Sequence, residues 1–503
     1  MSAKAIMVQG TASNAGKSIL VAALCRIFKQ DGYRVAPFKA QNMALNSYIT
    51  HDGFEMGRAQ VMQAQAAGLE PDVRMNPILL KPTSDMGSQV IVNGKAIGNR
   101  TAQQYWSNKK ALRPVVAAAY ESLAKEYDII VIEGAGSPAE INLKQDDLVN
   151  MGMAKLVHAP VLLVGDIDRG GVFASLYGTV KLLDAEEQSY IQGLIINKFR
   201  GDLKILRPGL TQLEQLVQKP VLGVIPYIEL DLDDEDSLSE RFQKSPKRHA
   251  PIQIAVINLP HISNFTDFRV LESMPDISVH YATRPEDLDK VDLIILPGTK
   301  STIADLKWLR TQGLETKIIR LHADGIPVFG ICGGYQMMGY HIADPNGIES
   351  GGEINGMNLL PVKTIFETQK TTTQVTGQIE KLNGLFTCLS GIKTTGYEIH
   401  MGNTVRFDNA PPFQKLHRKN KVVFDGCYMQ NAYGTYLHGI FDQPAVAQTL
   451  VHALLKKKGL NDIPQRTFDP LAYQEQQYDK LADMVRSSLN MEQIYQILED
   501  YHA

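Results

Sequence analysis

Short apolar runs alternate with helix-like segments through the first half of this 503-residue chain. Strands that alternate with helices in this way form parallel sheets with both faces covered. The first half is therefore predicted to be an α/β unit built on a parallel sheet. Its predicted strands are residues 5–10, 33–38, 127–134, 159–166, 191–199 and 221–226.

A second alternation of the same kind starts after a polar stretch, so we predict a second α/β unit. The stretch 229–250 is acidic first, then basic and nearly free of aromatic residues, which is typical of a linker. Residues 404–408 and 421–429 favour antiparallel strands, and the chain is helical in pattern from about Ala447 onward. The predicted division is a synthetase-like domain 1–228, a linker 229–250, a second domain 251–446 and a helical C-terminal extension 447–503.

Composition and charge argue against several classes of protein. The formal net charge of −3 favours neither nucleic acid nor an anionic membrane as a partner. No apolar run approaches the roughly 18–20 residues that a membrane span requires. The four cysteines lie far apart, without the spacing of a metal site or a disulfide framework. We therefore expect a cytoplasmic enzyme that binds no nucleic acid and no membrane.

A glycine-rich turn between a predicted strand and a predicted helix indicates a phosphate site. In GTASNAGKS (10–18), glycines free the backbone to fold around phosphate, and the helix N-terminus supplies N–H donors. Five residues separate the two glycines, one more than in the common motif, and a plain capped turn is the other interpretation. The predicted ATP-binding residues are Gly10, Thr11, Asn14, Ala15, Gly16, Lys17 and Ser18.

A magnesium ion that accompanies ATP needs oxygen ligands near this turn. Ser18 offers a hydroxyl, and Glu133 offers a carboxylate at the end of a predicted strand. Asp166 and Asp168 follow another strand and are weaker candidates, because each is as readily a helix cap or a surface charge. Asn197, at the end of a further strand, is predicted to read the adenine edge, although a plain strand-end turn explains it nearly as well.

The segment VFGICGGYQMMG, which begins at Val328, places Cys332 at a strand end with glycines around it. A side chain on such a sharp strand-to-helix turn is held out of the sheet, and the following helix favours a thiolate. A buried, unreactive cysteine is the other interpretation of a lone thiol. We therefore predict a nucleophile, provided that the chain supplies a base.

His438, in AYGTYLHGIF, is the strongest candidate for that base, since a neutral imidazole beside a thiol forms a thiolate–imidazolium pair. His400, in GYEIHMG, is a weaker rival, and it and Glu398 are kept as substrate-side groups. The N–H groups of Gly298 and Gly333 are predicted to form an oxyanion hole.

The two halves together resemble a known family. GICGGYQMMG and GTYLHGIF are similar to the nucleophile and histidine motifs of class I glutamine amidotransferases, and this resemblance adds Gln336 as a glutamine-binding residue. GTASNAGKS and EGAG resemble dethiobiotin synthetase-like ligases. With PFKAQNMALNS, DIDRGGVFA and NKFRGD, nearly the whole chain resembles the cobyric acid synthase family.

The resemblance implies ATP- and Mg²⁺-dependent amidation, with glutamine as nitrogen donor, in cobalamin biosynthesis. The implied acceptor is a corrinoid, adenosylcobyrinic acid a,c-diamide, at its b, d, e and g carboxylates. A glutaminase half-reaction at Cys332 and His438 would supply the ammonia.

Two positions depart from the related motifs. Most class I glutaminases carry a glutamate two residues after the histidine, where this chain has Ile440, so the triad is reduced to a pair unless another acid is present. The ligase relatives often carry an aspartate where this chain has Gln41 and Asn42, which leaves the second Mg²⁺ ligand open.

Two alternative functions stay open at this stage. One is a related glutamine-dependent ligase, such as a cobyrinate a,c-diamide synthase or an amidating ligase of cell-wall precursors. The other is a partitioning-type ATPase whose inactive glutaminase-like domain serves as a switch. The presence of both Cys332 and His438 argues against the second.

Overall fold

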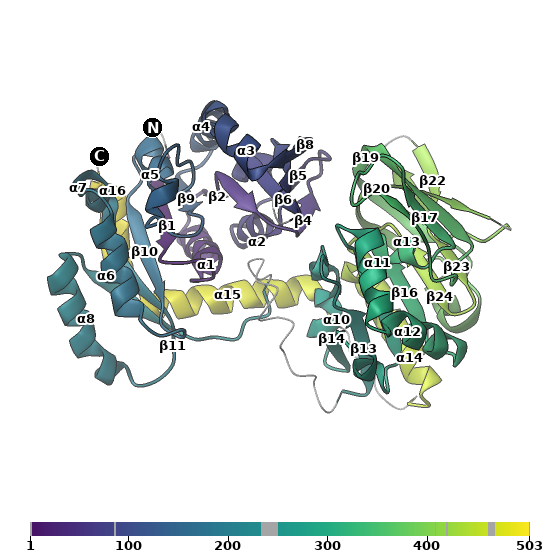
Figure 1. The fold of residues 1–503 in the computed structure, drawn as a ribbon. Helices are drawn as coiled ribbons and strands as arrows, with labels where there is room; N and C mark the ends of the chain where they lie inside the picture. Colours follow the sequence, from purple (N-terminus) through teal and green to yellow (C-terminus); the bar gives the residue numbers. More distant parts are fainter. Residues whose placement is uncertain are drawn as a thin grey trace. The chain divides into compact units, whose positions relative to one another are not determined.

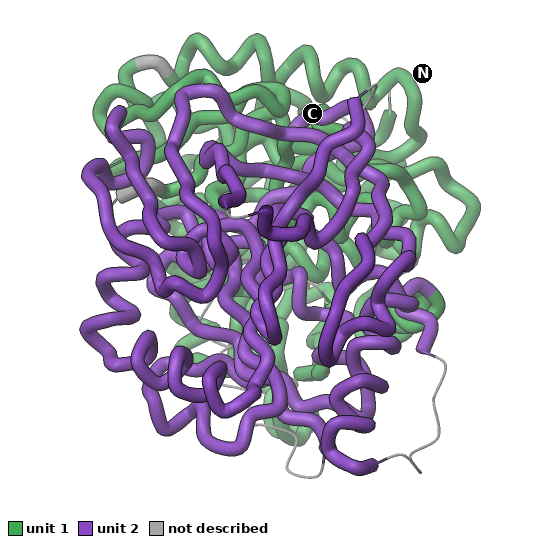
Figure 2. The backbone as a smooth tube through the Cα atoms, turned by 90° about the vertical axis from the view of Figure 1, so that its right-hand side faces the viewer, with its two compact units in different colours: residues 1–44, 55–237, 472–503 green, residues 45–54, 238–471 purple. Residues whose placement is uncertain are grey.

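The computed structural model describes residues 3–84, 87–232, 250–407, 409–418, 421–460 and 468–501. The chain divides into two compact units, and neither is continuous in sequence (Figure 2). Unit 1 comprises residues 1–44, 55–237 and 472–503, and unit 2 comprises residues 45–54 and 238–471. Each unit is an α/β structure with its own sheets, as the alternating pattern predicts.

The central sheet of unit 1 is parallel at every strand pair, and its middle strands are buried along most of their length. All six apolar runs predicted in the first half are its strands. In spatial order these are β12 (Val221–Pro226), β11 (Ile191–Phe199), β10 (Val161–Asp166), β1 (Lys4–Gly10), β9 (Ile129–Glu133) and β2 (Val35–Phe38).

Helices of unit 1 pack around this sheet (Figure 1). Because the strands are parallel, their carboxyl ends share one edge, and the loops that follow them meet there. The helices are α1 (Lys17–Gln30), α2 (Arg58–Ala66), α3 (Ala102–Asn108), α4 (Arg113–Ala124), α5 (Met151–Val157), α6 (Val172–Leu182), α7 (Ala185–Tyr190), α8 (Leu203–Val217), α15 (Pro470–Ser488) and α16 (Met491–Asp500).

A second, smaller sheet in unit 1 was not predicted. Its first pair is parallel and the other two are antiparallel hairpin pairs. The 3-10 turn η2 (Lys109–Leu112) follows α3 and closes this region against the loop after β9. The strands in spatial order are β3 (Gln41–Met43), β6 (Ile78–Ser84), β7 (Gly87–Val92) and β8 (Lys95–Thr101).

The central sheet of unit 2 is parallel except for one antiparallel edge strand. Its spatial order is β14 (Ile277–Ala282), β13 (Ile252–Ile257), β15 (Leu293–Leu296), β16 (Val328–Ile331), β24 (Ala432–Thr435) and β23 (Cys427–Met429). The helices of unit 2 are α10 (Arg269–Ser273), α11 (Thr302–Thr311), α12 (Leu314–Ala323), α13 (Gly333–Met337) and α14 (Pro444–Lys457).

A mainly antiparallel sheet covers the other side of unit 2. Its longest pair joins β19 (Val362–Ile379) to β20 (Lys393–Arg406), and the GYEIHMG segment lies in β20. This sheet contains the antiparallel strand predicted near residues 404–408 and the first part of the one predicted at 421–429, whereas residues 427–429 form β23, the antiparallel edge strand of the central sheet. The remaining strands are β17 (His341–Asp344), β18 (Gly352–Asn355), β21 (Gln414–Arg418) and β22 (Lys421–Asp425).

The grouping into units differs from the contiguous domains expected from the sequence. Residues 45–54 group with unit 2, and residues 472–503 return to unit 1. Helix α15 belongs to unit 1 because it buries Leu481 and Val485 in the core of that unit. The expected linker 229–250 lies largely outside the described residues.

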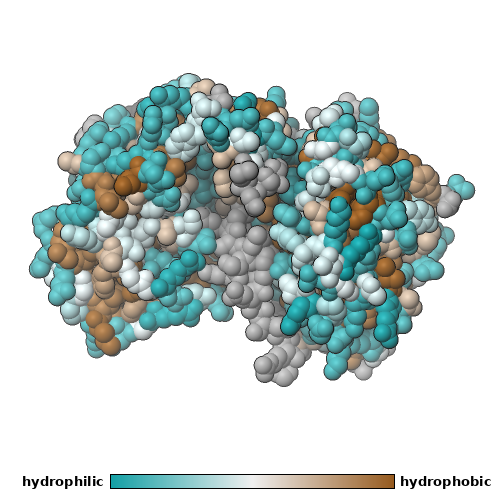
Figure 3. Space-filling view, viewed as in Figure 1, coloured by the Kyte–Doolittle hydropathy of each residue, from teal (hydrophilic) through white to brown (hydrophobic). Residues whose placement is uncertain are grey.

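The face of the molecule in Figure 3 is mostly hydrophilic, with hydrophobic side chains in scattered places. Single exposed apolar residues are usual on protein surfaces. In the part of the chain that the structure describes, no helix combines the length and apolarity needed to cross a membrane.

Candidate active sites

Cys332 occupies a tight strand-to-helix turn in unit 2. It follows β16, precedes α13 and has a φ of 51°, a conformation that only a few per cent of non-glycine residues adopt. Its N–H donates to Thr435 O of the neighbouring strand at 2.9 Å. A Cβ added to Gly334 would lie 2.0 Å from Leu296 O, so the turn requires glycine there. The geometry is that of a nucleophile elbow.

His438 lies beside Cys332 and against an acid that the sequence did not reveal. The His438 side chain lies close enough to that of Cys332 for the thiol to contribute to its pKa. On the other side of the ring, Nδ1 lies 2.7 Å from Oδ2 of Asp267. The other carboxylate oxygen of Asp267 accepts from the N–H of Gly439 at 3.1 Å. The nucleophile candidate, the base candidate and a carboxylate therefore form one continuous chain.

The carboxylate of Asp267 favours the protonated form of the His438 imidazole. Burial opposes the imidazolium, because His438 and Asp267 are almost inaccessible to water. The charge and hydrogen bond of Asp267, with a contribution from Cys332, overcome that effect and raise the pKa of His438 to about 10. The arrangement favours an imidazolium next to the thiol.

Ile440, at the position where most class I glutaminases carry a glutamate, is fully buried at the start of η7 (Ile440–Asp442). The acid comes instead from η4 (Phe265–Phe268), after β13. The sequence left open whether another acid orients His438, and in this structure Asp267 lies in that position. A buried carboxylate from another element takes the orienting position.

The turn after β15 lies between the other two parts of the site. A Cβ added to Gly298 would lie 3.2 Å from Cε1 of His438, and one added to Gly333 would lie 3.1 Å from the backbone N of Thr299. Asp305, from α11, fixes this turn by accepting from Thr299 Oγ1 at 2.5 Å. The predicted oxyanion donors thus adjoin Cys332 and His438.

Gln336 is held in place from both ends of its amide. Its Oε1 accepts from Thr302 Oγ1 at 3.1 Å, and its Nε2 donates to Tyr436 OH at 3.0 Å. The amide is buried below the elbow, where it positions the residues around Cys332. Contact with glutamine through Gln336 stays a prediction.

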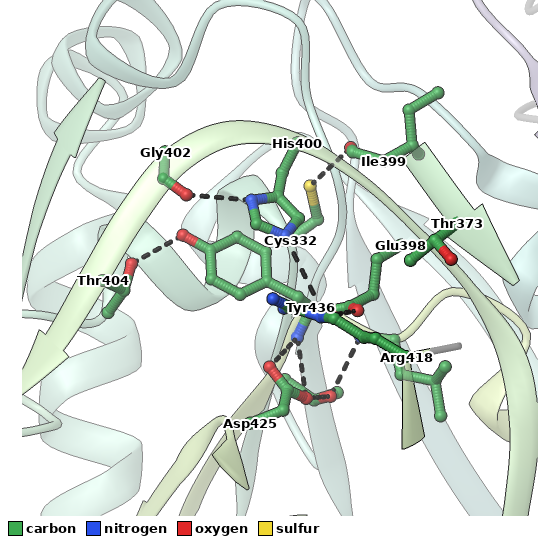
Figure 4. A network of polar contacts seen from close by, with 12 residues as sticks. Cys332, Thr373, Glu398, Ile399, His400, Gly402, Thr404, Arg418, Asp425 and Tyr436 are labelled. Atoms are coloured by element: carbon green, nitrogen blue, oxygen red, sulfur yellow. Dashed lines mark hydrogen bonds and ion pairs between the residues drawn. The ribbon is translucent and has the colours of Figure 1, made fainter. Parts of the chain in front are cut away.

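His400 is engaged elsewhere, as Figure 4 shows. Its Nδ1 donates to Gly402 O at 2.8 Å, and its ring stacks on Tyr436 with centroids 3.8 Å apart. The backbone oxygen of Ile399, its neighbour in β20, lies 3.7 Å from Sγ of Cys332. Strand β20 therefore places its backbone, rather than the imidazole of His400, against the thiol.

Glu398 of β20 is buried and forms an ion pair with the half-buried Arg418, with Oε2 2.5 Å from the guanidinium Nε (Figure 4). Burial favours the neutral acid, but His400 and Arg418 hold the pKa of Glu398 below its usual value. A cavity of about 210 Å³ lies here, lined by His400, Arg418, Asp425 and Tyr436 among others. Its polar walls suit a small zwitterion such as an amino acid.

The glycine-rich turn of unit 1 wraps the start of α1. Gly16 caps the helix with a φ of 95°, and Asn14 also has a positive φ of 61°. The buried Lys17 donates to Ala12 O at 2.9 Å and to Gly136 O at 3.3 Å. The loop thus presents a helix N-terminus and a lysine, which is an arrangement for binding phosphate.

Glu133, at the end of β9, is the centre of a buried polar cluster. Its Oε1 accepts from Ser18 Oγ at 2.7 Å and from Lys39 Nζ at 2.6 Å. Its Oε2 accepts from Gln60 at 3.2 Å and Gln63 at 2.5 Å, both from α2. Burial opposes ionisation, but Lys39 and the hydrogen bonds hold the pKa of Glu133 below its usual value.

The donor set at this point fits a magnesium ion that arrives with a nucleotide. Ser18 and Glu133 present hard oxygen donors 2.7 Å apart, next to the phosphate-binding turn. The positive charge of Lys39 neutralises the carboxylate in this structure. In the described part of the chain, no group of three or more Asp, Glu, His or Cys side chains forms a metal cage, so phosphates and water would complete the shell.

Three further candidates lie next to the phosphate-binding turn. Asn197 donates its side-chain amide to Ala15 O at 2.9 Å, so here it braces the turn. Asp166 pairs with Lys198 at 3.1 Å, and Asp168 pairs with Arg200 at 3.1 Å. The two aspartates thus belong to ion pairs, and contact of Asn197 with adenine stays a prediction.

Sequence reasoning missed Asp267 and Lys39. Lys39 precedes the quoted Gln41 and Asn42 in the same motif, so a lysine beside a strand end was a usable signal. Asp267 lies in NFTDFR, which carries no spacing typical of a catalytic acid. Only the fold brings it to His438.

Comparisons with known proteins match a nucleotide-binding domain to the first half of the chain and a glutamine amidotransferase domain to the second. Residues 6–239 match the CobQ/CobB/MinD/ParA nucleotide binding domain, and residues 253–446 match the CobB/CobQ-like glutamine amidotransferase domain. A cobyric acid synthase of Ruminiclostridium cellulolyticum is 57% identical over 99% of this chain and 98% of its own length. Cobyric acid synthases of Lachnoclostridium phytofermentans and Citrobacter koseri are 55% and 51% identical, each over 99% of both chains.

Proposed function

Because this chain belongs to the cobyric acid synthase family, we propose that it amidates the b, d, e and g carboxylates of adenosylcobyrinic acid a,c-diamide, with ATP and glutamine as co-substrates. Unit 2 would release ammonia from glutamine, and unit 1 would activate the acceptor carboxylate. The observation that carries this division is the chain of contacts from Cys332 through His438 to Asp267 in unit 2.

In the glutaminase half-reaction, the thiolate of Cys332 attacks the side-chain amide carbon of glutamine. N–H groups of Gly298 and Gly333 stabilise the oxyanion, and the imidazolium of His438 gives its proton to the departing ammonia. Asp267 keeps the imidazole oriented and balances its charge. Water, with His438 as base, then hydrolyses the thioester and releases glutamate.

In the synthetase half-reaction, an acceptor carboxylate oxygen attacks the γ-phosphorus of ATP, and ADP departs. Ammonia then attacks the acyl carbon of the acyl phosphate, and inorganic phosphate leaves. Lys17 and the N–H groups at the start of α1 stabilise negative charge on the transferred phosphoryl group. A magnesium ion held by Ser18 and Glu133 would supply further neutralisation of the phosphate oxygens.

The test separates the two half-reactions by their nitrogen source. Cys332→Ser should abolish glutamine-dependent amidation, because no thioester forms, while amidation with ammonium chloride at high pH should persist. The measurement is amide product by mass spectrometry and ADP by a coupled assay. Cys388→Ser is the matched control, because Cys388 is an exposed free cysteine of the same unit. Glutamine use by Cys332→Ser near the wild-type rate would remove Cys332 from the nucleophile role.

A further inference from the structure

Besides the cavity next to β20 in unit 2, the structure has a larger cavity in unit 1, and no residue proposed for catalysis lines it. Its volume is about 570 Å³. Strands β3, β6, β7 and β8, helix α3, the turn η2 and the loop after β9 contribute its walls. Apolar and aromatic side chains form much of its lining, with a few charged groups among them. This combination is typical of a site for a bulky, partly apolar ligand.

Two aromatic side chains of α3 line this cavity. Trp106 is one of only two tryptophans in the chain, and Tyr105 beside it donates its hydroxyl to Gln41 Oε1 at 2.5 Å. Gln41 belongs to the segment in which the sequence places neutral amides where relatives have an acid. The hydrogen bond therefore fixes a neutral amide at this point of the cavity wall, in place of a carboxylate that would repel an anionic ligand.

The cavity also has a buried cation. Lys109 is 6% exposed, and its ammonium lies over the ring of Trp106, 4.7 Å from the centroid. Among the residues that the structure describes, no carboxylate forms an ion pair with this ammonium, although Asp147 and Asp146 lie near enough to stabilise its charge. Arg100 lines the same cavity from β8. A desolvated cation without an ion-pair partner is suited to an anionic ligand.

The cavity reaches the phosphate-binding turn. Gly136, one of its lining residues, accepts a hydrogen bond from Lys17 at 3.3 Å. The preceding residue is held by Asn150, which donates to Ala135 O at 2.6 Å and accepts from its N–H at 3.1 Å. A ligand in this cavity would therefore lie next to the lysine that is proposed to bind the transferred phosphoryl group.

We propose that this cavity binds the acceptor, a large ring with an apolar face and several peripheral carboxylates. The ring lies against Trp106 and Tyr105, and carboxylates that are not reacting pair with Lys109 and Arg100. The carboxylates of Glu140 and Asp147, which also line the cavity, face the amide groups that the acceptor already carries. The inference rests on the proposed function and adds where the acceptor binds.

Equilibrium dialysis of the full chain with adenosylcobyrinic acid a,c-diamide, followed by the visible absorption of the corrinoid, tests the proposal. Lys109→Met should raise the Kd at least about tenfold, because a buried charge pair is lost, and Lys109→Arg should restore most of the affinity. Lys125→Met, at the C-terminus of α4 and outside the cavity, should bind like the wild type. Trp106→Ala should also weaken binding, and Trp106→Phe should weaken it less.

Glutamate release from glutamine and binding of a non-hydrolysable ATP analogue should be unchanged in all these variants, which shows that they fold. Arg100→Gln is a second variant on a partly exposed strand and should weaken corrinoid binding without loss of fold. Wild-type affinity in Lys109→Met, Trp106→Ala and Arg100→Gln would overturn the site while leaving the proposed function intact. Loss of ATP-analogue binding instead would assign the cavity to the nucleotide. A wild-type chain that binds no corrinoid would overturn the proposed function as well.

Discussion

At the scale of single residues, both sites depend on a buried charge matched by an opposite one. His438 is paired with Asp267 at 2.7 Å, and Glu133 with Lys39 at 2.6 Å. All four side chains are almost inaccessible to water. Removal of one partner from such a pair leaves an uncompensated charge in a low dielectric, which makes these residues informative to substitute.

The first prediction concerns Asp267→Asn. Asp267 raises the pKa of His438, so its neutralisation should lower that pKa and cause the imidazolium to be lost at lower pH. The alkaline limb of glutamate release, expected near pH 10 in the wild type, should therefore move to lower pH. The rate should also fall, by about 10²–10⁴-fold, as for other oriented acid–base groups.

The measurement is the pH profile of glutamate release without ATP or corrinoid. Asp287→Asn, which removes a carboxylate from a surface turn of the same unit, should leave the profile unchanged. An alkaline limb that stays in place in Asp267→Asn would contradict the orienting role of Asp267.

The second prediction concerns Lys17→Ala. Loss of a charge aimed at the transferred phosphoryl group should raise the barrier by about 2–4 kcal/mol, whichever nitrogen source is used. Glutamate release should continue, because Lys17 belongs to unit 1. ADP release is measured with glutamine and with ammonium chloride. An unchanged rate in both would exclude Lys17 from the phosphate site.

At the scale of elements, both sites are built on the same strand–turn–helix arrangement. In each unit a buried parallel strand ends in a tight turn and a helix begins: β1 leads to α1, and β16 leads to α13. The helix N-terminus leaves unpaired N–H groups at the turn, which suit a phosphate in one unit and an oxyanion in the other. The chemistry differs because the turn carries Lys17 in one case and Cys332 in the other.

The third prediction concerns helix α15, which completes the core of unit 1 from the far end of the chain. Leu481 is fully buried in that core, so Leu481→Ala should destabilise unit 1 by about 2–5 kcal/mol. Chemical denaturation followed by binding of an ATP analogue measures the effect. Leu471→Ala, at an exposed position of the same helix, should change stability by less than about 0.5 kcal/mol.

Glutamate release should be less sensitive to Leu481→Ala than nucleotide binding is, because unit 2 has its own core. Equal sensitivity of both activities to denaturant would show that the two units unfold as one.

At the scale of the whole molecule, the residues that we propose for each half-reaction lie within one unit. Cys332, His438 and Asp267 lie in unit 2, and Lys17 and Glu133 lie in unit 1. The chain nevertheless crosses between the units four times, after residues 44, 54, 237 and 471, because residues 45–54 group with unit 2 and residues 472–503 return to unit 1.

The fourth prediction is a basal glutaminase activity. Asp267 orients His438 without any ligand in unit 1, so glutamate release should be detectable with glutamine alone. Cys332→Ser should abolish it. Glutamate release is measured with glutamine alone and again with ATP and corrinoid. Release that occurs only when both are present would show that unit 1 has to set the geometry of unit 2.

Much of the fold and part of each site were predictable from sequence, because the signals are local. Apolar runs predicted all six strands of the central sheet of unit 1, and the glycine-rich segments predicted the turns at Lys17 and Cys332. A buried strand and a tight turn depend on neighbouring residues, through burial of a short run and through the backbone freedom of glycine. These signals come from residues that are adjacent in the sequence.

The tertiary structure decided the partners and the grouping of segments. Asp267 is 171 positions from His438, and Lys39 is 94 positions from Glu133. The return of residues 472–503 to unit 1 likewise depends on which apolar faces meet. When no local motif surrounds a carboxylate, the sequence does not show which residue it will pair with. The packing of elements that are distant in sequence decides that pairing. The local sequence therefore determined the turns that carry Lys17 and Cys332. The tertiary structure determined that Asp267 and Lys39 lie beside the ionisable groups of the two sites.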